Sequence, residues 1–196
     1  MPDPSPIDPG SLVLATERLI AGRRTIHRFD PARPVPPDLL RRAVALATRA
    51  PNHKHTEPWR FVALTGATRE QLVDLNADLV RAKSGDAAAD DKRARWNEVP
   101  AYLVATCRRS DDAVREREDR DACAAALQNL ALALWAEGVG AKWTTGPVTR
   151  TEHFFALTGV DPDAEAVVGL FMIGYPADVP APPKRQDVDA VLTFLD

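Results

Sequence analysis

Two clusters of hydrogen-bond donors in this sequence have the residue types that bind an anion. The first is Arg23, Arg24 and Thr25, which directly follow Gly22, a residue that favours the end of a helix. The second is the polar loop of residues 49–58, which reads R-A-P-N-H-K-H-T-E-P. The planar fork of an arginine makes two charge-assisted hydrogen bonds to a phosphate. Because one predicted helix separates the clusters, we expect a single anionic ligand that is contacted from two sides.

Each cluster also has a simpler interpretation. Adjacent arginines just past a helix are common in solvated basic turns. In the loop, Asn52 and His53 could donate to a ligand or only stabilise the turn. His53 and His55 suggest a metal, but zinc needs three or four ligands at a recognisable spacing, and neither H-E-x-x-H nor a cysteine pair at metal-ligand spacing is present in the sequence. We therefore expect no metal site.

Residues 142–146, K-W-T-T-G, form a third candidate. Backbone N–H groups and the hydroxyls of Thr144 and Thr145 can bind an anionic or heteroaromatic group, whereas Trp143 could equally be a core residue next to a turn. The sequence lacks the phosphate-binding motifs G-x-G-x-x-G and G-x-x-x-x-G-K-[ST], and it lacks the G-x-S-x-G nucleophile elbow. A nucleotide would therefore have to be bound by arginine side chains.

The hydrophobic pattern predicts the elements that must position these clusters. Apolar residues at helical spacing predict helices over residues 12–21, 36–50, 68–80, 119–137 and 151–157, and the charged stretch of residues 84–98 is interpreted as an exposed helix and lid-like connection. Continuous apolar or β-branched runs predict strands over 59–65, 101–107 and 166–173, with a short strand after Gly140. This order lacks a regular βαβ alternation, which favours the α+β class. The final V-L-T-F-L, residues 191–195, could be a short edge strand or a swapped strand.

Composition limits the cellular setting and the partners. The net charge of −3 gives no general attraction to nucleic acid or to an anionic membrane, and no apolar run is long enough to span a membrane. Cys107 and Cys123 each lie in an apolar run, which favours buried, reduced thiols and a cytoplasmic location. We expect residues 1–11, rich in proline and acids, to be a disordered tail and residues 12–196 to be one domain.

The predicted helix over residues 119–137 suggests a partner subunit. Between Ala122 and Trp135 only Gln128 and Asn129 are polar, and a helix that is apolar nearly all round is buried on most of its sides. A domain of this size has little core to cover such a helix completely, so we expect a second copy to cover part of it.

Four sequence blocks together resemble the nitroreductase family of FMN-dependent enzymes. They are R-R-T-I-H-R-F-D, A-T-R-A-P-N-H-K-H-T-E-P-W-R-F-V, G-V-G-A-K-W-T-T-G and V-V-G-L-F-M-I-G-Y-P-A, and they occur in the family order. The resemblance extends from about residue 17 to about residue 187 and is greatest to the compact bacterial branch, whose loop carries A-P-[ND]-H-K. It implies a mostly antiparallel sheet flanked by helices, in an intertwined homodimer with FMN at each subunit interface.

The resemblance also implies which residues bind FMN. The R-R-[ST] block contacts the flavin ring and its phosphate, the loop block often acts from the partner subunit, and the K-W-T-T-G block lies along the ring. A basic residue of the C-terminal stretch, Arg185 or Lys184, reaches the phosphate. The implied FMN-binding residues are Arg23, Arg24, Thr25, Arg49, Asn52, His53, Trp143, Thr144, Thr145 and Arg185.

The implied activity is the reduction of nitroaromatic, quinone or related acceptors. NADPH or NADH would donate a hydride to flavin N5 in a ping-pong mechanism, and the flavin, with no dedicated catalytic side chain, carries out the chemistry. Two alternatives stay open on the same fold, an oxygen-using flavin enzyme and a non-catalytic flavin-binding protein. The physiological acceptor, the choice between NADPH and NADH, the residues that line the substrate face and the role of Glu57 are left unassigned.

Overall fold

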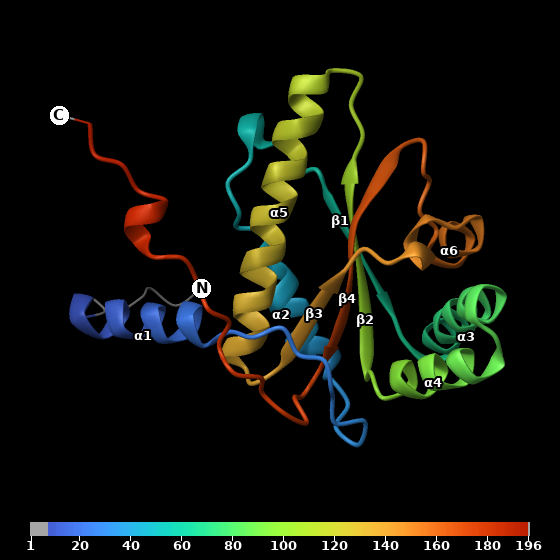
Figure 1. Cartoon of the computed structure of the whole chain (residues 1–196). Helices are drawn as coiled ribbons and strands as arrows, with labels where there is room; N and C mark the ends of the chain where they lie inside the picture. Colours follow the sequence, from blue (N-terminus) through green and yellow to red (C-terminus); the bar gives the residue numbers. More distant parts are fainter. Residues whose placement is uncertain (1–7, 196) are drawn as a thin grey trace.

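A four-stranded sheet forms the centre of the computed structural model, which describes residues 8–195 (Figure 1). Its strands are β1 (Trp59–Leu64), β2 (Ala101–Arg108), β3 (Gly140–Thr144) and β4 (Glu165–Gly174), in the order β1-β2-β4-β3. Every neighbouring pair is antiparallel, which confirms the α+β class and the mostly antiparallel sheet. The two central strands are buried along most of their length, and this is why their sequences are continuous apolar runs.

Helices cover both faces of the sheet. One face packs against α2 (Pro37–Ala47) and α5 (Ala113–Ala136), and the other against α3 (Gly66–Ser84), α4 (Asp86–Asn97) and α6 (Glu152–Thr158) (Figure 1). Alternate residues of β2 point to opposite faces, so that Leu103 lies in the α2–α5 core and Tyr102 in the α3–α4–α6 core. Helices α2, α3, α5 and α6 are held by burial of their apolar sides in these two cores, and α4 packs mainly against α3.

Two helices begin three or more residues earlier than their apolar patterns predict, because an aspartate caps each one. Helix α1 (Pro9–Gly22) starts at Pro9, where Asp8 Oδ2 accepts from Ser11 N at 2.8 Å. Helix α5 starts at Ala113, where Asp112 Oδ1 accepts from Val114 N at 2.9 Å and from Arg115 N at 3.3 Å. Residues 9–11 are therefore helical, which corrects the last part of the expected tail of residues 1–11. The first seven residues of that tail lie outside the described part of the chain.

Helix α1 and the C-terminal segment extend away from the sheet on the same side of α5 (Figure 1). No residue of α1 is buried, and its Leu12 and Ile20 side chains are 50% and 56% exposed. The strand predicted at residues 191–195 is wrong for a single chain, because these residues extend away from β1 and β3, the two edge strands, and Leu195 is 92% exposed. Within residues 8–195, none of the helices is long and apolar enough to cross a membrane.

Helix α5 is buried on one side only in a single chain. Leu127, Leu130 and Leu134 are buried against the sheet, whereas Ala124 and Leu132 are half-buried and Gln128 is exposed. The partly exposed alanines and leucines leave an apolar side of α5 open.

Tyr102 makes this fold less stable at alkaline pH. Its side chain is fully buried and its hydroxyl donates to Trp96 O at 2.8 Å. Burial raises the pKa of Tyr102 well above its ordinary value of about 10. Above about pH 10 the unfolded chain therefore loses a proton that the folded chain keeps, so stability falls as pH rises, by up to about 1.4 kcal/mol per pH unit.

We expect a Tyr102→Phe variant to lose less stability between about pH 8 and about pH 11 than the wild type loses. Urea unfolding at both pH values measures the two differences, and the lysine titrations that are common to both proteins cancel in the comparison. Equal losses in the two proteins would show that Tyr102 does not titrate on unfolding.

Candidate functional site

The arginine cluster lies on an extended segment that adds to the sheet beside β3. After α1 ends at Gly22, Thr25 forms a parallel bridge with Ala141, and Ile26 N donates to Ala141 O at 3.2 Å. The side chains of Ile26 and Phe29 are buried and anchor the segment in the core. This anchoring fixes where the intervening polar side chains lie.

A pocket of about 780 Å³ lies over this segment, between the end of α1, α5 and the C-terminal segment. It brings together Arg23, Arg24, Thr25 and Arg185, although about 160 residues separate Arg185 from the others in the sequence. The remainder of its lining comprises Ile20, Ala21, His27, Gln128 and residues 180–183. This lining, within the described residues, includes no carboxylate, so the pocket carries three guanidinium charges and favours an anion.

The two adjacent arginines have different contacts. Arg24 Nη1 donates to Ala21 O at 2.6 Å and to Arg23 O at 2.9 Å, and so it satisfies a carbonyl at the end of α1. The guanidinium of Arg23 has no hydrogen bond or ion pair to another side chain or carbonyl within residues 8–195 and is half-buried. Arg24 thus supports the shape of the site, whereas all the donors of Arg23 are available to a ligand.

His27 and Gln128 also line the pocket, although neither was among the predicted ligand-binding residues. Thr25 and His27 are two residues apart on an extended segment, so both side chains point to the same side, and that spacing could have identified His27. Gln128, one of the two polar residues in the apolar part of α5, is exposed and lines the pocket. The interruption of an apolar helix by an amide was the available signal.

The loop residues lie at a different place. Asn52 and His53 line a shallow pocket against the N-terminal half of α5, and His53 Nδ1 lies 3.0 Å from Glu118 Oε2. Asn52 Oδ1 accepts from Glu57 N at 3.0 Å, so Glu57 contributes its backbone to the loop while its side chain is exposed. Arg49 is exposed just after α2. A single chain does not bring these residues to the arginine pocket.

Residues Trp143, Thr144 and Thr145 lie at the far end of β3, away from Ala141 and the arginine segment. The indole of Trp143 stacks on Phe171 with ring centroids 5.7 Å apart, and its Nε1 donates to Val168 O at 3.1 Å. Trp143 is nevertheless 43% exposed, so the simpler interpretation of the sequence, in which Trp143 is an ordinary core residue, does not hold. These residues also do not line the arginine pocket of the same chain.

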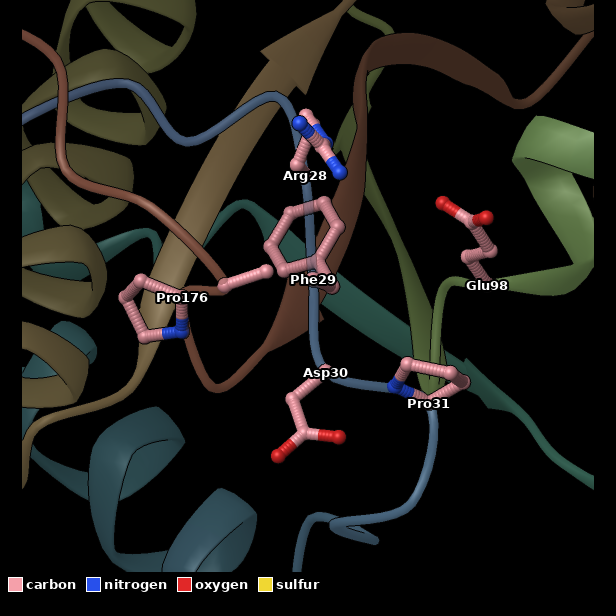
Figure 2. A pocket seen from close by; sticks show the side chains of 7 residues that line it. Arg28, Phe29, Asp30, Pro31, Glu98 and Pro176 are labelled. Atoms are coloured by element: carbon pink, nitrogen blue, oxygen red, sulfur yellow. The ribbon is translucent and has the colours of Figure 1, made fainter.

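A second pocket, of about 420 Å³, lies beside the next residues of the same segment, Arg28 to Pro31 (Figure 2). Figure 2 shows Phe29 in the middle of this lining, with Arg28 above it, Pro176 on one side and Glu98 on the other. It contains none of the residues that the sequence assigns to a ligand. In the described residues, no group of three or more His, Cys, Asp or Glu side chains converges to hold a metal ion, and both cysteines are free thiols buried in the core.

Comparison with known proteins decides the family. The model described as Nitroreductase family matches residues 20–175, which include the arginine segment, the loop and β3. The chain belongs to the nitroreductase family. The resemblance seen in the four sequence blocks is thereby confirmed, and Arg185 lies outside the matched residues.

Relatives of this nitroreductase family member match nearly its whole length. YfhC of Bacillus subtilis strain 168, which carries an NAD(P)H nitroreductase name, is 27% identical over 174 residues, covering 87% of this chain and 89% of YfhC. The crystal structure of a nitroreductase-like family protein from Bacillus cereus has a TM-score of 0.79 and 31% identity, covering 91% of this chain and 95% of that chain. The FMN-dependent nitroreductase NfnB from Mycobacterium smegmatis, solved in complex with NADPH, has a TM-score of 0.75 and 21% identity, covering 94% and 100%. These matches confirm the nitroreductase fold.

Proposed function

We propose that this nitroreductase family member is an FMN-dependent oxidoreductase that uses NAD(P)H to reduce nitroaromatic, quinone or related acceptors. The observation that carries the proposal is the arginine pocket, because three guanidinium groups and a hydroxyl converge there without a carboxylate. Family membership and FMN-dependent relatives of the same fold support it.

The donor set of the pocket fits FMN. A flavin mononucleotide has a dianionic phosphate at one end and ring carbonyls at the other, and it needs donors at both ends. Arg23 and Arg185, whose guanidinium groups have no hydrogen bond or ion pair within residues 8–195, supply forks suited to a phosphate, and Thr25, His27 and Gln128 add shorter polar groups. A volume of about 780 Å³ is within the range of cofactor sites.

The protein side of the chemistry is binding, orientation and charge stabilisation. FMN, when bound, supplies two-electron transfer between a nicotinamide and an acceptor in a ping-pong order. Guanidinium donors of this pocket would stabilise the negative charge that develops on the flavin ring during reduction. The lining of the pocket, as far as residues 8–195 describe it, contains no carboxylic acid that could donate a proton, and we propose that solvent supplies the protons.

We also propose that the complete site is shared between two copies of the chain. The loop residues contact α5 near Glu118 and Asp119, whereas the arginine pocket reaches Gln128, nine residues or about 13 Å further along the same helix. Two α5 helices packed in opposite directions would place the loop of one subunit beside the pocket of the other. The open apolar side of α5 and the exposed apolar residues of α1 and of the C-terminal segment support such an intertwined homodimer.

The visible spectrum of the purified protein tests the proposed function. We expect a flavin spectrum that is bleached when NADPH or NADH is added without oxygen and that returns when a nitroaromatic or quinone is added. Rapid oxygen consumption without turnover of these acceptors would favour an oxygen-using flavin enzyme. Flavin that neither nicotinamide reduces would favour a non-catalytic flavin-binding protein, and a colourless protein that ignores added FMN would overturn the proposal.

A further inference from the structure

The loop of residues 52–57 has an unfavourable backbone. Lys54, His55 and Glu57 have φ angles of 56°, 52° and 44°, in the left-handed region that residues other than glycine rarely adopt. Three such residues within four positions persist only where surrounding contacts hold them. The loop therefore depends on anchors that can be identified.

Contacts to α5 supply the anchors from outside the loop. Thr56 Oγ1 donates to Asp119 Oδ1 at 2.5 Å, and His53 Nδ1 lies 3.0 Å from Glu118 Oε2. The side chains of the second pair are 57% and 40% exposed, so solvent weakens that contact. Asp119 is only 5% exposed, and a charge-assisted hydrogen bond is strong at such a site. Thr56 is thus the principal anchor of the loop.

In the described part of the chain, the Asp119 carboxylate has no other partner. Within residues 8–195, the hydroxyl of Thr56 is the one side-chain or backbone donor that is hydrogen-bonded to this carboxylate. A buried carboxylate is costly unless it is hydrogen-bonded, and a buried apolar residue would pack in α5 without that cost. The presence of an aspartate at position 119 is therefore explained by its contact with the loop and not by the stability of α5.

We propose that Thr56 and Asp119 are positioning residues that hold the strained loop in the shape in which Asn52 and His53 reach the flavin site of a second copy. The proposal rests on the proposed function. Inside the loop, Asn52 O accepts from His55 N at 3.3 Å and Asn52 Oδ1 accepts from Glu57 N at 3.0 Å. Thr56 lies between the amides of His55 and Glu57. Its hydrogen bond to Asp119 therefore holds both amides in place and, through them, Asn52 and the neighbouring His53.

The test compares Thr56→Val with two matched variants. Thr56→Ser keeps the donor, and Thr158→Val removes another buried hydroxyl, which donates to Phe154 O at 2.7 Å in α6, far from the loop. In the protein without flavin, hydrogen exchange of the His55 and Glu57 amides is expected to be about tenfold faster in Thr56→Val, because a bond to a charged group is lost. The Kd for FMN is expected to rise about tenfold in the same variant.

Thr56→Ser is expected to match the wild type in both measurements, and Thr158→Val is expected to lower Tm while leaving loop exchange and the Kd for FMN unchanged. Should Thr56→Val not fold, Asp119→Asn replaces it, and its weaker, uncharged acceptor is expected to give about a threefold change in each measurement. Unchanged loop exchange, or faster exchange with an unchanged Kd, would overturn the positioning role while the proposed function stands. A wild-type protein that binds no FMN would instead overturn the proposed function.

Discussion

An Arg23→Ala variant is expected to bind FMN about tenfold to a hundredfold more weakly than the wild type, with an unchanged free energy of unfolding. A hydrogen bond to a charged group contributes about 1.5–3 kcal/mol, and a guanidinium can make two of them to one phosphate. Within residues 8–195 the Arg23 guanidinium has no protein partner, so its removal leaves no protein group unsatisfied. Titration of the flavin-free protein with FMN and urea unfolding measure the two quantities.

Two other arginines of the same segment serve as controls. Arg24→Ala is expected to weaken FMN binding and also to lower stability by about 1 kcal/mol, because Arg24 Nη1 donates to Ala21 O at 2.6 Å. Arg28→Ala, whose side chain lines the separate pocket of Figure 2, is expected to leave FMN affinity unchanged. Wild-type affinity in Arg23→Ala, or an equal loss in Arg28→Ala, would contradict the assignment of the phosphate site.

A Gly169→Ala variant is expected to lower the free energy of unfolding by about 2–3 kcal/mol. A Cβ added at Gly169 would lie 2.5 Å from Cδ1 of Trp143 and closer still to its Nε1. The indole cannot move without loss, because Nε1 donates to Val168 O and the ring stacks on Phe171. The added methyl group would push the indole of Trp143 out of this position, and the predicted flavin contact at Trp143 would be displaced with it.

Gly146→Ala is the matched control for this substitution. Gly146 lies two residues beyond β3 with a φ of −58°, and the nearest atom to an added Cβ, Thr144 Oγ1, is 3.7 Å away. Its free energy of unfolding is expected to stay within about 0.5 kcal/mol of the wild type. Urea unfolding monitored by tryptophan fluorescence measures both variants. Similar stability of the two variants would show that Trp143 is not packed on Gly169 as described.

The central fold was predictable because its elements carry strong local patterns. The unbroken apolar runs around Leu103 and Leu170 identify buried strands, and the pairing of β2 with β4 follows from their burial. Element boundaries were less predictable. The start of α5 depends on the cap at Asp112, which lies before a stretch of charged residues without a clear apolar period.

The grouping of the site residues depends on long-range contacts that local patterns do not encode. Nothing in the spacing around Arg23 or Arg185 places them in one pocket, and the link came from the resemblance. The apolar pattern of α5 covers an open side as well as a buried one, so it did not by itself assign Gln128 to the exposed side. Residues 191–195 are irregular for a related reason. Their β propensity favours a strand, but a strand forms only where a sheet edge is available for pairing, and the local sequence does not show where such an edge lies.

Sedimentation of the FMN-loaded protein, followed in the visible absorption band of the flavin, tests most directly whether two chains jointly bind the cofactor. The chain has a mass of 21.4 kDa. The account predicts that all bound flavin sediments with a species of twice that mass and that the species holds one FMN per chain. Flavin bound to a single chain of 21.4 kDa would contradict the shared site.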